Sequence, residues 1–132
     1  MSSASSIATA VTQVLSRFPQ IRLAILFGSC AKGNATTASD VDLAVQADKP
    51  LDAELSIRLI GAMAEQLGQP VDLIDLHTAG EPLLGEVLKG RRLLGSDTNF
   101  ARLITRHLLD AADFLPYRER ILSERRRQWK AS

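Results

Sequence analysis

The chain has 132 residues, of which 45% are hydrophobic and 23% are charged. This size and composition are typical of one globular domain with a single core, and they exclude an intrinsically disordered chain. The net charge of +1 excludes a globally basic surface for nucleic acid. No apolar run approaches the roughly 20 residues of a membrane-spanning helix.

Residues 1–18 lack the basic segment and continuous apolar stretch of a signal peptide. The single cysteine, Cys30, cannot form an internal disulfide, which fits a reducing compartment. We therefore expect a soluble, cytoplasmic protein that makes no membrane contact.

The first predicted element is a helix that Ser5 or Ser6 would cap and that Pro19 would end. Two β-rich runs follow, at 21–27 and 41–45, separated by a Gly-Ser turn and a polar loop. The apolar residues of the helix recur at helical spacing: Ile7, Val11, Val14, Leu15 and Phe18.

A second helix is predicted to begin after the N-cap Asp52 and to end at Gly68, with Pro70 just beyond. A third strand is expected at 71–76 and a short helix at 81–89. We expect one face of the second helix to pack on the core: Ile57, Ile60, Met63, Ala64 and Leu67.

The remaining pattern predicts a short strand at 91–94 and a helical region from about Asp97 to Trp129, interrupted at Pro116. This order of elements predicts an α+β domain in which helices flank a small mixed β-sheet. Residues 1–96 would form the core, and 97–132 a C-terminal helical extension of the same domain that docks a partner.

Two aspartates, Asp40 and Asp42, stand two residues apart at the start of the second strand, so they project from the same face. If the strand at 71–76 lies beside it, Asp72 would be about 5 Å away. Three such carboxylates repel one another unless a divalent cation binds them, and oxygen ligands favour Mg²⁺ or Mn²⁺. The alternative is two solvated acids at a strand edge.

Asp75 competes with Asp72 as the third carboxylate. Because their separation is odd, the two side chains point to opposite faces of the strand. We expect Asp72 at the metal site and Asp75 at the strand end or as a cap.

The turn before the aspartates suits a phosphate group. Gly28 lets the backbone approach a ligand, and Ser29 would begin a short helix whose free N–H groups attract anions. Ser29 could instead be only a helix cap, and Lys32 could reach a phosphate or remain solvated. The spacing of Gly28 and Gly33 also matches a P-loop, but no lysine follows the second glycine.

These motifs together resemble the DNA polymerase β-like nucleotidyltransferase superfamily. The chain is similar to its minimal nucleotidyltransferase (MNT) type, which is often encoded beside HEPN-domain proteins as a toxin–antitoxin pair. The resemblance covers residues 21–95 and rests on three segments: Gly28-Ser29-x-Ala31-x-Gly33, then Ser39-Asp40-x-Asp42-Leu43, then Asp72 in its apolar strand.

The resemblance implies that Gly28 and Ser29 contact the phosphates of ATP, that Asp40 and Asp42 bind two Mg²⁺ ions, and that Asp72 completes the metal triad. Asp72 would also position or deprotonate the acceptor hydroxyl. The family transfers AMP to a partner HEPN toxin, typically to a tyrosine, and so acts as an antitoxin that assembles with its toxin; nucleic acid is not the expected substrate.

Two alternatives remain open: a non-catalytic antitoxin that acts by occlusion, and a nucleotidyltransferase for a small molecule such as an aminoglycoside. The chain has no room for a second, acceptor-holding domain, so we expect a partner to supply the acceptor. Cys30 departs from the family pattern. The cluster Arg125, Arg126 and Arg127 is either a solvated helix face or a contact for an acidic partner or RNA.

Overall fold

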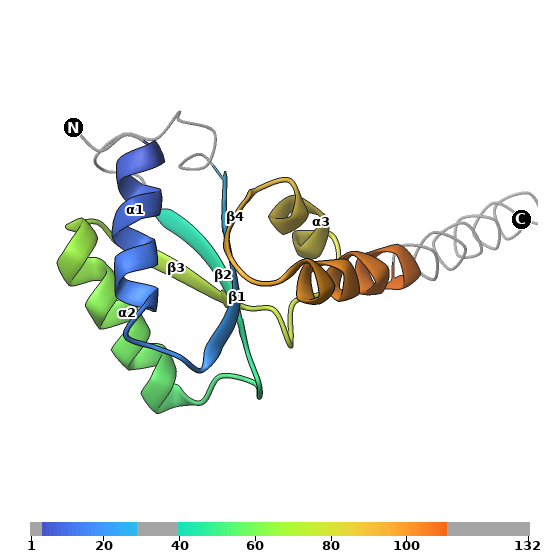
Figure 1. The fold of residues 1–132 in the computed structure, drawn as a ribbon, viewed down its shortest axis with the longest axis horizontal. Coiled ribbons are helices and arrows are strands. Elements are labelled where there is room, and N and C mark those ends of the chain that lie inside the picture. The colour runs from blue at the N-terminus through green and yellow to red at the C-terminus, as the bar shows by residue number, and fades with distance from the viewer. Residues whose placement is uncertain (1–3, 29–39, 111–132) are drawn as a thin grey trace, which may run out of the picture.

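The chain is described here by a computed structural model, which covers residues 4–28 and 40–110. No helix in those two ranges is both long enough and apolar enough to cross a bilayer. The helical residues 97–110 follow the last strand (Figure 1), and the expected continuation to 129 with its break at Pro116 lies outside the described residues. The elements before them are α1 (Ala4–Leu15), β1 (Ile21–Phe27), β2 (Val41–Ala47), α2 (Ala53–Leu67), β3 (Val71–Asp75), α3 (Leu83–Leu88) and β4 (Arg91–Leu94).

The four strands form one mixed sheet in the order β3-β2-β1-β4. β1 is antiparallel to both β2 and β4, whereas β2 is parallel to β3. Two parallel neighbours need a long crossover between them, and α2 supplies it. The predicted class, an α+β domain with a small mixed sheet flanked by helices, is confirmed.

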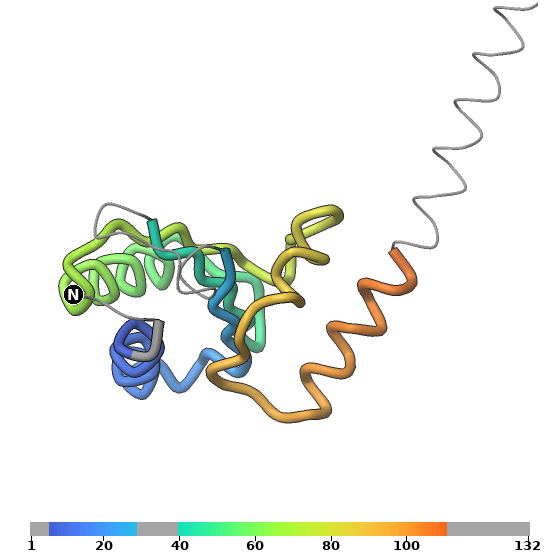
Figure 2. The backbone as a smooth tube through the Cα atoms, turned by 90° about the horizontal axis from the view of Figure 1, so that it is seen from above, coloured from blue at the N-terminus to red at the C-terminus, as the bar shows by residue number. Residues whose placement is uncertain are grey.

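Each face of the sheet has its own apolar core. α1 and α2 cover one face, and α3 with the helical residues 97–110 covers the other (Figures 1 and 2). Side chains alternate along β1, so Ala24 and Leu26 enter the first core while Leu23, Ile25 and Phe27 enter the second. The second face, which α3 and residues 97–110 cover, matters for function because polar side chains of β2 and β3 lie on it.

The predicted buried face of α2 is partly wrong. Ile57 is 70% exposed and Ile60 is 39% exposed, whereas Leu59, which the prediction omitted, is fully buried beside Met63. Leu55, Leu59 and Met63 are four residues apart and therefore form one row along the helix. That row faces the sheet, and Leu55 packs against the same core. The apolar residues of α2 form two rows along the helix, and the position of the sheet determines which row is buried.

The predicted capping of α1 is also wrong, since α1 begins at Ala4 and Ser5 and Ser6 lie inside it. Serines at positions 2, 3, 5 and 6 offer the same cap chemistry, so residue type alone does not select the start of the helix. α1 ends at Leu15, before Pro19, and a turn leads to the buried Phe18.

Both predicted ends of α2 are confirmed. The backbone N–H of Leu55 donates to Asp52 Oδ1 at 2.7 Å, which satisfies one of the free donors of the first turn. At the other end Gly68 adopts a left-handed conformation with φ of 67°, and its N–H donates to Ala64 O at 2.8 Å.

Asp52→Ala should lower the free energy of unfolding by about 1 kcal/mol, because the first turn of α2 loses its side-chain acceptor. Asp52→Asn keeps an acceptor oxygen and should stay near the wild type. Urea denaturation of the three proteins measures the difference. Equal losses in both variants would show that the charge, and not the hydrogen bond, stabilises the helix.

Candidate active site

Asp42 and Asp72 occupy partner positions on adjacent parallel strands, β2 and β3. The condition on which the sequence placed Asp72 beside Asp42, that these two strands are neighbours, is therefore met. Neighbouring strands lie about 4.8 Å apart. Asp42 is two residues before Ala44, and Asp72 is two residues before Ile74, so each aspartate shares a face with that apolar residue. Both carboxylates therefore lie on the second face of the sheet.

Asp40 joins this pair electrostatically. It stands exposed just before β2 and is separated from Asp42 by one residue. The pKa of Asp42 is raised above its ordinary value, chiefly by burial and then by the negative charges of Asp72 and Asp40. The negative charges of Asp72 and Asp40 thus both act on Asp42 at this end of β2 and β3.

Gly28 stands against the carboxylate of Asp42. It follows β1 directly, and the last residue of that strand, Phe27, pairs with Asp42 across the antiparallel ladder. The φ of Gly28 is +74°, and a Cβ placed there would collide with Asp42 Oδ2. A glycine is needed at this position for its conformation and for its lack of a side chain.

The donor chemistry of these residues fits a hard divalent cation, because Asp40, Asp42 and Asp72 offer only carboxylate oxygens. A cation would also offset both the burial and the neighbouring negative charges that raise the pKa of Asp42. Across residues 4–28 and 40–110, however, no three His, Cys, Asp or Glu side chains stand ready to hold a metal ion. The carboxylates would therefore have to converge on binding.

The other residues predicted to contact phosphate, Ser29 and Lys32, lie outside the described residues, as does Cys30. The same holds for the arginines at 125–127 and for the extension beyond 110. Their roles stay predictions.

Asp75 has the strand-end role that its position predicted. Its Oδ2 accepts a hydrogen bond from the backbone N–H of Leu51, and its Oδ1 accepts one from the N–H of His77, both at 2.9 Å. These bonds tie the end of β3 to the segment that leads into α2. Because Asp75 points away from the face of Asp42, it is a structural residue rather than a rival of Asp72.

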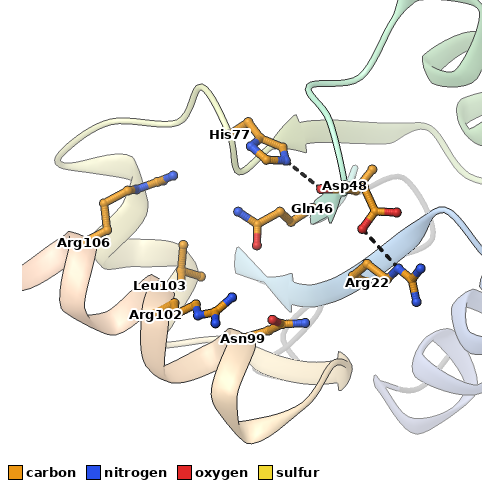
Figure 3. Close-up of a pocket in the computed structure, with 9 residues that line it drawn as sticks. Arg22, Gln46, Asp48, His77, Asn99, Arg102, Leu103 and Arg106 are labelled. Atoms are coloured by element: carbon orange, nitrogen blue, oxygen red, sulfur yellow. Dashed lines mark hydrogen bonds and ion pairs between the residues drawn. The ribbon is translucent and has the colours of Figure 1, made fainter.

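A polar cavity at the opposite end of β2 was not predicted from the sequence. Several of its lining residues come from the helical segment 97–110 (Figure 3). The sequence signal that could have revealed it is the spacing of Asn99, Arg102 and Arg106, which three- and four-residue steps place on one helix face.

Comparison with known proteins gives matches over most of the described chain. Residues 9–99 match the family described as polymerase beta, nucleotidyltransferase. Protein adenylyltransferase MntA of Shewanella oneidensis is 37% identical over 79 residues, which are 59% of this chain and 57% of that protein. The match thus spans less than two thirds of the relative's length.

Solved structures agree with the family match along nearly the whole fold. A toxin–antitoxin crystal structure with AMP-PNP superposes with a TM-score of 0.78 at 27% identity, covering 89% of this chain and 96% of the other. A crystal structure of the toxin–antitoxin MntA-HepT gives a TM-score of 0.72 at 25% identity, covering 89% and 95%. Since the family match takes in well over half of its residues, the chain belongs to the polymerase beta nucleotidyltransferase family.

Proposed function

We propose that this chain is a Mg²⁺-dependent protein adenylyltransferase that transfers AMP from ATP to a tyrosine hydroxyl of a HEPN-domain toxin and so acts as its antitoxin. The observation that carries the proposal is the pairing of Asp42 with Asp72 at one end of the sheet, with Gly28 against the Asp42 carboxylate. The relative named protein adenylyltransferase MntA and the toxin–antitoxin structure with AMP-PNP support it.

In this proposal Asp40, Asp42 and Asp72 hold two Mg²⁺ ions. When bound, the ions polarise the α-phosphate of ATP and stabilise the leaving pyrophosphate. Gly28 and Ser29 bind the phosphates through backbone N–H groups, which need a backbone free of a side chain at Gly28.

Asp72 has the further role of positioning the acceptor. Its side chain lies on an edge strand and is exposed, so a hydroxyl from another molecule can reach it. Asp72 accepts the hydroxyl proton as the acceptor oxygen bonds to the α-phosphorus, while the bond from that phosphorus to the departing pyrophosphate breaks. The products are an AMP ester and pyrophosphate.

The acceptor comes from a partner in this proposal, and the C-terminal helical extension at 97–132 docks it. Within the described part of that extension, Leu108 is 61% exposed and Leu109 is 62% exposed. Adjacent exposed leucines on a helix are suited to burial in a protein interface. The basic residues at 117–132 would add charge complementarity to an acidic partner.

The test is to incubate the purified chain with ATP labelled on its α-phosphate, Mg²⁺ and the HEPN-domain protein expected beside its gene. We expect the label on the HEPN protein, and mass spectrometry should place it on a tyrosine. The matched control is Asp40→Ala combined with Asp42→Ala, which should transfer no label although it still binds the partner.

Three outcomes would contradict the proposal. Equal labelling by the double variant would remove the aspartates from the mechanism. Neutralisation of the toxin without nucleotide, and equally by the double variant, would indicate an antitoxin that acts by occlusion. Labelling of an aminoglycoside with none on protein would indicate a small-molecule enzyme.

A further inference from the structure

A cavity of about 330 Å³ opens at the end of β2 that is opposite to the carboxylates (Figure 3). Gln46 lines it and lies four residues beyond Asp42 on the same face of the strand. At about 3.3 Å per residue, the two positions are roughly 13 Å apart. Ala44 of the second core lies between them on that face of β2. The cavity is thus a site separate from the aspartates.

Positive charge dominates the lining. Arg22, Arg102 and Arg106 contribute three guanidinium groups, against the single carboxylate of Asp48. Arg22 Nε lies 3.3 Å from Asp48 Oδ1, so that acid is already paired. Neither Arg102 nor Arg106 forms an ion pair with a carboxylate in the part of the chain that the structure describes. Two cationic groups therefore line the cavity without a paired carboxylate among residues 4–28 and 40–110.

Arg106 is held in place with one donor unused. Its Nη2 donates to Ala79 O at 3.0 Å, which anchors the guanidinium against the segment before α3. Its Nε is buried, and within residues 4–28 and 40–110 no acceptor meets it. Buried N–H groups nearly always have an acceptor, so the unmet Nε leaves the positive charge of Arg106 uncompensated at this wall of the cavity.

Neutral donors complete the lining. Figure 3 shows Asn99 rising from the helical segment 97–110 while Gln46 extends from β2. His77 Nε2 lies 2.6 Å from the backbone oxygen of Ala47. Because that oxygen can only accept, Nε2 carries a proton and His77 is anchored to β2. Donors from a strand and a helix thus surround one space.

We propose that this cavity binds a small phosphate-bearing ligand. The two uncompensated guanidinium groups match the charge of a phosphate dianion, and arginine forks fit phosphate oxygens well. A tetrahedral phosphate presents its acceptor oxygens in three dimensions, whereas the acceptor sites of a carboxylate lie close to one plane. The volume lies within the range of small-molecule sites. This site is independent of the proposed AMP transfer and would persist if that activity were absent.

The experiment is a titration of the full chain with inorganic phosphate, followed by NMR at constant ionic strength and with EDTA present. EDTA keeps divalent cations from drawing phosphate to the carboxylates, and the fixed salt keeps screening constant. We expect saturable shifts in the side-chain amide signals of Gln46 and Asn99 and in the Nε–H signal of Arg106.

Two variants and a second anion make the test specific. Arg102→Gln should weaken phosphate binding at least about tenfold, because a charge-assisted hydrogen bond is lost. Arg102 is exposed, so the variant should fold, and an unchanged far-UV circular dichroism spectrum checks this. Arg17→Gln removes another exposed arginine, one outside the cavity, and should leave the affinity unchanged. Acetate, a carboxylate of unit charge, should bind at least about tenfold more weakly than phosphate.

Several results would overturn the proposal. They are the absence of saturable shifts, shifts centred on Gly28 and Asp42 in place of Gln46 and Asn99, and equal losses in the two arginine variants. Acetate that binds as tightly as phosphate would assign the site to carboxylates and overturn the phosphate assignment.

Discussion

Asp42→Asn should abolish AMP transfer, by at least about a hundredfold, and at the same time raise the free energy of unfolding at neutral pH. The first effect follows if Asp42 binds both metal ions, since an amide replaces a charged ligand. The second follows from the pKa of Asp42, which burial and the charges of Asp72 and Asp40 raise. A residue that costs stability and supports catalysis is typical of active sites.

The raised pKa of Asp42 makes the free energy of unfolding depend on pH. Between the pKa of the unfolded chain and the higher pKa of the folded chain, the folded state binds more protons. The free energy of unfolding of the wild type therefore falls as the pH rises through this window, and it stays lowered above it. The asparagine side chain of the variant does not titrate, so the variant's advantage should be largest above the folded pKa and vanish in acid.

Chemical denaturation in EDTA across this pH range measures the effect, and labelled ATP measures the transfer. Adding Mg²⁺ should stabilise the wild type and not Asp42→Asn, because a cation that binds only the folded state shifts the equilibrium toward it. A variant that is less stable than the wild type at neutral pH would contradict the electrostatic argument. Persistent AMP transfer would contradict the role of Asp42 as a ligand.

Asp75→Asn is the matched control, an aspartate on the other face of β3. Its two oxygens accept hydrogen bonds from the N–H groups of Leu51 and His77, and an amide can replace only one of these acceptors. Asp75→Asn should therefore lower the stability, while the folded fraction keeps its AMP transfer. The two aspartates lie on opposite faces of the sheet, and their variants should respond in opposite directions.

The sequence predicted those features of the fold that depend on a few neighbouring residues. The cap at Asp52 and the left-handed end at Gly68 are local hydrogen-bond chemistry, and both were confirmed. The buried row of α2 was predicted in part wrongly, because Ile57 and Leu59 are both apolar and only the position of the sheet distinguishes them. Local periodicity gives a helix, but the face it buries is a property of the whole fold.

The candidate site was likewise predicted only in part from the sequence. That Asp40 and Asp42 share a face follows from strand alternation alone, whereas the pairing of Asp42 with Asp72 needs the parallel register of β2 and β3. The arginine-lined cavity was missed because β1, β2 and the helical segment 97–110 each contribute to it. Residues that are far apart in the sequence, such as Arg22 and Arg102, meet there, and no local pattern predicts such a meeting.

Gly28→Ala should lower both stability and AMP transfer. The conformation of Gly28 shapes the turn after β1, and its lack of a side chain leaves room for the carboxylate of Asp42. A non-glycine residue at φ of +74° costs about 1–2 kcal/mol, and the added Cβ would collide with Asp42 Oδ2. The carboxylate has to move away from the position where β2 places it. We expect at least about a tenfold loss of transfer and a weaker stabilisation by Mg²⁺.

Gly61→Ala is the matched control for this change, because a Cβ at Gly61, inside α2, meets nothing within 4 Å. Alanine is the better helix former, so Gly61→Ala should raise the free energy of unfolding by about 0.5–1 kcal/mol and leave the transfer unchanged. Denaturation curves and transfer rates of the two variants separate the contributions. Gly28→Ala could lose stability and still bind Mg²⁺ and transfer AMP as the wild type does. That result would show that Gly28 shapes only the turn and that its close approach to Asp42 has no role in catalysis.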